Sequence, residues 1–178
     1  MKTVLAVVLV LAAIFVGGGF LLPSTYAIER STSIAAGPDQ IAPYVQDLKR
    51  WQDWTIWNST DNPEFESSYA GPESGTGAEM SWTEGTSGTG SLKIAKLGAH
   101  GGIEYGFTME YAMIGEASGT GSIELQPTGE STEVRWKEEF TTDEMLGRWM
   151  GLFSDVAMGD MLETSLDKLK SKAESSGS

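Results

Sequence analysis

The chain has 178 residues, and its 12 Lys and Arg against 25 Asp and Glu give a formal net charge of −13 at pH 7. With no Cys and a single His, the chain excludes disulfides, thiol catalysis and metal sites built from Cys or from several His. The acidic excess repels phosphate groups, which argues against nucleic acid and anionic lipid surfaces as electrostatic partners.

Residues 1–24 are predicted to form a membrane anchor. No charged residue occurs within residues 4–22, and a helix of this length, at about 1.5 Å per residue, crosses the roughly 30 Å apolar layer of a bilayer. Lys2 adds positive charge on the N-terminal side, whereas the charges of Glu29 and Arg30 cancel on the other side. Because positive charge favours the cytoplasm, we expect a single-pass protein with a cytoplasmic N-terminus and a periplasmic or extracellular domain.

A cleaved signal peptide is the alternative interpretation of the same segment. Thr25-Tyr26-Ala27 resembles a small-residue processing site, and cleavage near Ala27 would release a secreted domain. The apolar run is longer than the roughly 7–15 residues of a typical signal-peptide core, which favours the anchor. Both interpretations export the remainder of the chain.

The first part of the exported domain is predicted to be a strand followed by helices. Residues 26–34 alternate between two faces, which is typical of a strand with a polar outer side. Asp39 is a suitable cap for a helix that continues to Leu48. A short helical stretch follows, because three tryptophans at a spacing of three residues share one side of a turn: Trp51, Trp54 and Trp57.

From residue 64 onward the hydrophobic period changes to two, which predicts a run of strands. Glycine-rich turns separate them, and connections this short indicate antiparallel neighbours. The predicted strands are 64–70, 77–84, 89–97, 102–114, 117–126 and 132–141. One face of the fourth of these is almost entirely apolar or aromatic, and it consists of Ile103, Tyr105, Phe107, Met109, Tyr111 and Met113.

The last segment, residues 143–173, has the spacing of a single long helix. At about 1.5 Å per residue this helix would be near 45 Å long, so it needs a broad sheet to lie on. Residues 174–178 are expected to be a disordered polar tail. The apolar stripe of the helix consists of Trp149, Phe153, Val156, Leu162, Leu166 and Leu169.

These elements together describe an α+β helix-grip architecture, in which a curved antiparallel sheet of about seven strands packs on a long C-terminal helix. The sequence resembles the START-like (SRPBCC) superfamily, in particular polyketide cyclase/dehydrase-like proteins with an N-terminal membrane segment. The resemblance covers about residues 25–173. It rests on Ile28-Glu29-Arg30-Ser31 with Ile34, Val45-Gln46-Asp47-Leu48, the three spaced tryptophans, Gly75-x-Gly77 with Trp82, and Thr132-Glu133-Val134-Arg135-Trp136.

The resemblance implies an apolar cavity between the sheet and the long helix, of the kind that holds lipids, sterols or polyketides. Some members are cyclases or hydrolases, but the family has no universal catalytic residue, so none is carried over. Large rings and flexible thioethers suit an apolar ligand, although a filled core is the alternative. The candidate ligand-binding residues are Arg30, Met80, Trp82, Tyr105, Phe107, Met109, Tyr111, Trp136, Glu138, Trp149 and Phe153.

Two charged residues interrupt apolar strand faces. Glu138 alternates with Trp136 and Phe140, and Arg30 lies between Ile28 and Thr32. If the first and last strands pair, Arg30 and Glu138 meet, and such a pair would offset the cost of burying either charge. The pair is expected to be a structural tether, with contact to a ligand headgroup as the alternative.

We therefore expect a membrane-anchored protein that binds a small hydrophobic molecule, a lipid or a lipophilic metabolite, without a cofactor or metal. The first alternative is a cyclase or hydrolase-like enzyme that uses Glu138, Tyr105 or Tyr111 as acid and base groups in the same cavity. The second is a structural or assembly domain of the cell envelope with a solid interior. His100 lies in a predicted turn, where solvent exposure is the expectation.

Overall fold

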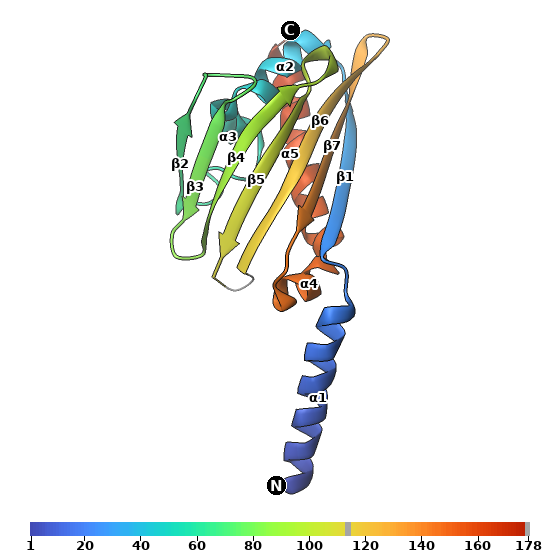
Figure 1. Cartoon of the computed structure of the whole chain (residues 1–178). Coiled ribbons are helices and arrows are strands. Elements are labelled where there is room, and N and C mark those ends of the chain that lie inside the picture. Colours follow the sequence, from blue (N-terminus) through green and yellow to red (C-terminus); the bar gives the residue numbers. More distant parts are fainter. Residues whose placement is uncertain (113–114, 177–178) are drawn as a thin grey trace.

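The computed structural model describes residues 1–112 and 115–176, apart from the side chain of Ala12. Its N-terminal helix α1 (Lys2–Leu21) extends away from the folded domain (Figure 1). With a mean hydropathy of 2.8, α1 is long and apolar enough to cross a membrane. The connection from α1 to the domain is short, because the first strand begins at Thr25.

The domain is built on one seven-stranded sheet in which every neighbouring pair is antiparallel. The spatial order is β1-β7-β6-β5-β4-β3-β2, so the last strand in the sequence lies beside the first. All seven predicted strands are present within about three residues, although the expected position of Met113 lies outside the described residues. Their bounds are β1 (Thr25–Ile34), β2 (Phe65–Ala70), β3 (Glu79–Glu84), β4 (Gly88–Leu97), β5 (Ile103–Tyr111), β6 (Gly115–Thr128) and β7 (Ser131–Thr141).

Three short helices connect β1 to β2. The predicted helix through Leu48 is interrupted at Asp47, whose backbone is extended. The Asp47 carboxylate accepts a hydrogen bond from the backbone N–H of Lys49 at 3.0 Å and so begins a new helical turn. The helices are α2 (Pro38–Gln46), the 3-10 helix η1 (Leu48–Arg50) and α3 (Trp51–Trp54).

Two of the spaced tryptophans fix α3 against α2. The indole N–H of Trp51 donates to the carbonyl of Val45 at 2.9 Å, and that of Trp54 donates to the carbonyl of Tyr44 at 3.0 Å. Both indoles are buried, so their N–H groups need such partners. The three-residue spacing therefore indicates a core position, with the polar ends of both rings satisfied by backbone.

The prediction of one continuous C-terminal helix is wrong. The segment forms α4 (Met145–Gly151) and α5 (Ser154–Ser176), separated by a turn. The Ser154 hydroxyl donates to the carbonyl of Gly151 at 2.7 Å, and the ring of Tyr26 occupies the space that a side chain at position 151 would need. The chain turns here so that α4 fits beneath the end of β1.

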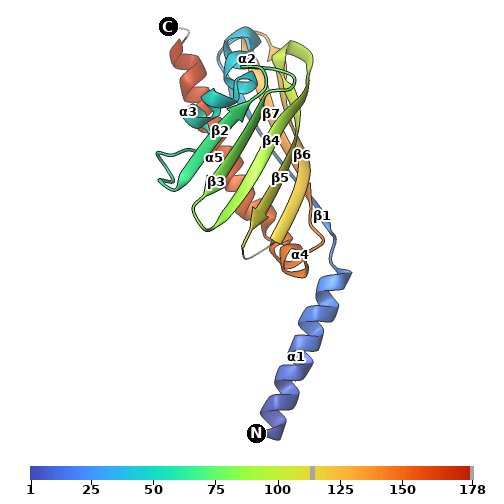
Figure 2. The same cartoon turned by 60° about the vertical axis from the view of Figure 1, so that its left-hand side comes forward.

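α5 crosses the inner face of the curved sheet, with α2 and α3 beside its C-terminal end (Figure 2). Of the predicted apolar stripe, only the last three residues are buried: Leu162, Leu166 and Leu169. Residues 174–176 of the expected disordered tail are helical, and positions 177–178 lie outside the described residues. α5 continues through Ser176, and the Glu174 carboxylate accepts a hydrogen bond from the backbone N–H of Ala35 at 2.8 Å.

Candidate functional site

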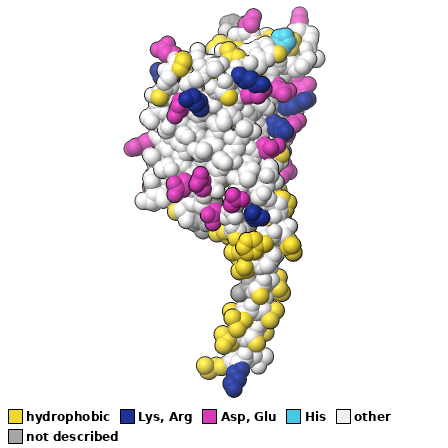
Figure 3. Space-filling view, in the orientation of Figure 1, with side chains coloured by type: hydrophobic (Ala, Val, Ile, Leu, Met, Phe, Trp, Pro, Cys, Tyr) yellow, Lys and Arg dark blue, Asp and Glu magenta, His cyan; other side chains and the backbone are white. Residues whose placement is uncertain are grey.

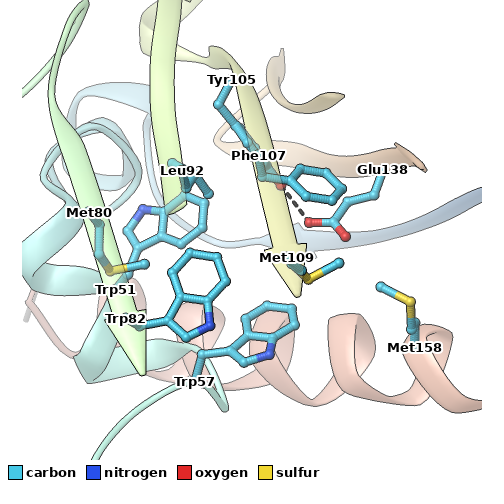
Figure 4. Close-up of a pocket in the computed structure, with 10 residues that line it drawn as sticks. All are labelled: Trp51, Trp57, Met80, Trp82, Leu92, Tyr105, Phe107, Met109, Glu138 and Met158. Carbon is cyan, nitrogen blue, oxygen red and sulfur yellow. Dashed lines mark hydrogen bonds between the residues drawn. The ribbon is translucent and has the colours of Figure 1, made fainter. Parts of the chain in front are cut away.

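An apolar pocket lies between β3, β4 and β5 of the sheet, the tryptophans after α2 and the N-terminal part of α5 (Figure 4). Its volume is about 40 Å³. This is room for roughly three water molecules and far below the roughly 300–1,000 Å³ of a typical ligand site. The interior is therefore much fuller than the sequence suggests. The lining residues are Trp51, Trp57, Met80, Trp82, Leu92, Tyr105, Phe107, Met109, Glu138 and Met158.

Strand register brings the sheet side of this lining together. Met80 is paired with Leu92, and Leu92 with Phe107, so three apolar side chains form a row across β3, β4 and β5. In the next row Trp82 is paired with Gly90. A Cβ atom at Gly90 would collide with the indole of Trp82, so this glycine lets the ring lie flat over β4.

A second glycine allows Tyr105 to reach a carboxylate two strands away. Tyr105 in β5 pairs with Gly121 in β6, and Gly121 pairs with Glu138 in β7. Because position 121 has no side chain, the Tyr105 ring crosses β6, and its hydroxyl donates a hydrogen bond of 2.6 Å to Oε1 of Glu138. The indole N–H of Trp136 donates to the same hydroxyl at 2.7 Å.

The resulting Trp136–Tyr105–Glu138 chain is the polar part of an otherwise apolar pocket. Glu138 is only 6% exposed, and burial raises the pKa of its carboxyl, while the hydrogen bond from the Tyr105 hydroxyl acts in the opposite direction. Burial, and next the negative charge of Glu138, raise the pKa of Tyr105 well above 10. The tyrosine therefore stays a proton donor, whereas the carboxyl is shifted toward protonation.

The expected pairing of Arg30 with Glu138 is wrong. Both residues lie on inner strand faces, but the Arg30 guanidinium turns toward α5. There Nη1 lies 3.0 Å from Oδ1 of Asp155, and Nη2 donates to the Asp155 carbonyl at 2.9 Å. The guanidinium fills the space above Gly159, which has no side chain to block it. Arg30 thus ties β1 to the start of α5 and lies outside the pocket.

The other predicted site residues are divided between the pocket and its surroundings. Six of the eleven line it: Met80, Trp82, Tyr105, Phe107, Met109 and Glu138. Trp136 is fully buried behind this lining, and the Tyr111 hydroxyl donates to Glu84 at 3.4 Å. Trp149 and Phe153 lie outside the pocket: Trp149 stacks on Phe15 of α1, and Phe153 is exposed.

Four lining residues were absent from the prediction: Trp51, Trp57, Leu92 and Met158. The three-residue tryptophan spacing was a usable signal for the first two. Leu92 was detectable from strand alternation with Ile94, which is also buried. Met158 carries no signal in the sequence, since its position depends on where α5 begins.

Trp82 has one further property. Its Nε1 is the only buried polar side-chain atom without a hydrogen-bond partner in the described parts of the chain. Leaving such a donor unpaired costs about 1–3 kcal/mol. A donor of this kind in the pocket wall is available to a polar atom of a bound molecule.

Neither the single histidine nor a cluster of metal-ligand side chains adds to the pocket in the described residues. His100 is exposed in the 3-10 helix η2 (Ala99–Gly101), with a φ of 54°, and does not line the pocket. Within residues 1–112 and 115–176, no group of three or more His, Cys, Asp or Glu side chains is placed to hold a metal ion.

The family model described as "Polyketide cyclase / dehydrase and lipid transport" matches residues 25–174. A search of curated proteins finds no match. Among solved structures, protein CV1439 of Chromobacterium violaceum is similar with a TM-score of 0.60 and 15% identity, over 86% of this chain and 99% of the other. Mll3558 of Rhizobium loti has a TM-score of 0.60 and 16% identity, over 83% and 96%. The structure titled Ara h 8.0201 has a TM-score of 0.56 and 11% identity, over 85% and 99%.

Proposed function

Because the chain belongs to the polyketide cyclase/dehydrase and lipid transport family, we propose that it is a membrane-anchored binding protein for a small hydrophobic ligand. The observation that carries this proposal is the composition of the pocket. Its wall is made mainly of tryptophan, methionine, leucine and phenylalanine side chains. Apart from the indole N–H groups of Trp51 and Trp57, its polar groups are those of Tyr105, Glu138 and Trp82, whose N–H is unpaired. Such a wall binds an apolar body and orients a single polar group.

Ligand uptake requires side chains at the pocket to move, because the present volume is about 40 Å³. Figure 4 shows Met109 from β5 and Met158 from α5 pointing toward each other at one side of the pocket. Both are only partly buried, as is Trp57. Methionine side chains are flexible, so these two are the ones we expect a ligand to displace.

Retention of the N-terminal anchor is supported by the position of Tyr26. Its ring stacks on Phe140 with centroids 5.6 Å apart, and its hydroxyl donates to the carbonyl of Arg148 at 2.6 Å. Cleavage near Ala27 would remove this residue from β1. We therefore propose that α1 stays attached and crosses the membrane, with the domain on the outer side.

The test is native mass spectrometry of the full chain released from detergent micelles, followed by organic extraction of any bound molecule. We expect a co-purifying hydrophobic compound, and loss of it when Met158→Trp fills the pocket. Met161→Trp is the matched control, because Met161 lies on the same helix and is exposed. A ligand-free spectrum for the wild type, or equal occupancy in Met158→Trp, would refute binding at this site.

A second candidate function is supported by the hydrogen bond between Tyr105 and Glu138. A buried carboxyl with a raised pKa beside a tyrosine can exchange a proton with a bound carbonyl compound, which is the requirement of cyclisation and dehydration. Turnover of a linear poly-β-keto thioester by the full chain tests this. Glu138→Gln should abolish the reaction while the compound still binds, whereas unchanged turnover would remove Glu138 from any catalytic role.

A further inference from the structure

We propose that the α4–α5 elbow, residues 145–156, lies in the outer interface of the membrane, so that the domain rests on the lipid surface. This inference rests on the proposed anchoring by α1. It adds a second membrane contact, made by the folded domain itself. The partner is the lipid bilayer that α1 enters.

The depth of the elbow follows from its contacts with α1. The ring of Trp149 stacks on Phe15, with centroids 5.3 Å apart and planes 6° from parallel, and its indole N–H donates to the Phe15 carbonyl at 3.1 Å. Phe15 precedes the end of α1 by six residues, which is about 9 Å along the helix. If α1 spans the apolar layer, Trp149 is therefore held below the outer end of that helix.

Two glycines of α1 make this contact close. A Cβ atom at Gly18 would lie 3.0 Å from Cζ2 of Trp149, and one at Gly19 would lie 2.6 Å from Cγ of Met145. The absence of side chains at Gly18 and Gly19 therefore lets α4 approach α1 closely. The elbow cannot lift from the membrane without separating these packed side chains.

The exposed surface of the elbow has the composition of a lipid contact. Outside residues 1–21, seven large hydrophobic side chains are exposed in the described residues, and five of them lie in this stretch of twelve residues. Their exposed fractions run from 39% to 67%, which is unusual for side chains that face water. They are Leu146, Met150, Leu152, Phe153 and Val156.

The charged groups of the elbow do not oppose this placement. Arg148 has Nη2 3.7 Å from Oδ1 of Asp143, and Nη1 donates to the carbonyl of Leu22 at 3.4 Å, where α1 ends. Asp155 is paired with Arg30. Figure 3 shows hydrophobic side chains along α1 up to the lower end of the domain, where charged side chains begin. With a net charge of −13, the chain has to use apolar insertion to hold a membrane surface.

The elbow also places the pocket beside the bilayer. Met158, which lines the pocket, follows Val156 by two residues on α5. Met109 lies near the end of β5 that points toward α1 (Figure 1). The pocket therefore lies near the end of the domain that the elbow holds at the membrane.

The absence of cysteine from the chain makes spin labelling a direct test. Phe153→Cys and Val156→Cys are labelled with a nitroxide in the full chain, which is then reconstituted into phosphatidylcholine vesicles. Leu9→Cys reports on α1, and Glu130→Cys reports on the turn after β6. Collisions of each label with oxygen, which concentrates in lipid, are compared with collisions with a water-soluble nickel chelate.

We expect the labels at positions 153 and 156 to collide preferentially with oxygen, as the label at position 9 does. The label at position 130 should prefer the nickel chelate. Nickel preference at 153 and 156 together with oxygen preference at 9 overturns the inference and leaves the anchor in place. Nickel preference at 9 rejects the anchor, and the proposed contact fails with it. Because positions 153 and 156 are exposed, their substitution leaves the core intact.

Discussion

The aromatic lining of the pocket depends on a missing side chain at Gly121, and Gly121→Ala tests that dependence. A Cβ atom at this position would collide with the ring and hydroxyl of Tyr105. Tyr105 is fully buried between α3 and the sheet, and the pocket that it lines, of about 40 Å³, is too small to accept the displaced ring. The substitution should therefore displace the ring and break its hydrogen bond to Glu138.

The expected cost is the sum of two effects. Overpacking of a well-filled core costs about 1–3 kcal/mol. Loss of a buried hydrogen bond to a carboxyl group adds about 1.5–3 kcal/mol. We predict that Gly121→Ala lowers the free energy of unfolding by about 2.5–6 kcal/mol, a large share of the roughly 5–15 kcal/mol of an ordinary domain.

The assay is urea unfolding of the full chain in detergent, with tryptophan fluorescence as the measure of unfolding. Gly106→Ala is the matched control, because it adjoins Tyr105 and its added Cβ would meet only the carbonyl of Gly119, at 3.8 Å. That variant should change stability by less than about 1 kcal/mol. If Gly121→Ala unfolds within 1 kcal/mol of the wild type, Gly121 does not make room for Tyr105.

Two further predictions concern pH and packing. The folded-state pKa of Glu138 is raised from its ordinary value of 4.5, so the folded protein binds the proton more tightly and stability falls as pH rises between the unfolded and folded values. Denaturant titrations at several pH values give the unfolding free energy as a function of pH, and Glu138→Gln should reduce its fall with rising pH. If the fall is unchanged in the variant, other groups cause it. Leu166→Ala should cost about 2–5 kcal/mol, because Leu166 is buried under the sheet. Leu97→Ala, at an exposed position, should cost less than about 0.5 kcal/mol in the same unfolding assay.

The strands were predictable because alternation reports which side of a strand is buried. In β5 the buried Ile103, Tyr105 and Phe107 alternate with more exposed neighbours, as their spacing indicates. The faces of Arg30 and Glu138 were also correct, since both lie inward. Their side-chain partners were not predicted correctly. The long side chain of Arg30 reaches Asp155 at the start of α5 instead of Glu138.

The turn between α4 and α5 had no signal in the sequence. No proline occurs there, and the spacing of Trp149, Phe153 and Val156 fits an unbroken helix. At the turn, Gly151 packs against Tyr26, a residue 125 positions earlier in the chain. A contact between residues so far apart in the sequence forms only once the chain has folded, so the local sequence pattern does not reveal it. Trp149 and Phe153 both lie outside the candidate site: Trp149 packs against Phe15 of α1, and Phe153 is exposed.

The role of Gly121 was hidden for a related reason. A glycine within a strand predicts only a weak or bent position. Its effect on Tyr105 and Glu138 requires the register of three strands, which the sequence does not specify. The resemblance to a known superfamily supplied the pairing of the first and last strands. The alignment of Tyr105, Gly121 and Glu138 across β5, β6 and β7 is seen only in the structure.

The connection between α1 and β1 limits where this protein can operate. It consists of Leu22, Pro23 and Ser24, and the Ser24 carbonyl is bonded to the backbone N–H of Thr142 at 2.9 Å. Three extended residues reach at most about 10 Å. If α1 is held in a membrane and the domain carries a ligand, as proposed, so short a connection keeps the domain at that membrane. A recipient of the ligand then has to reach the domain there, by diffusing within the same bilayer or by docking from the aqueous side.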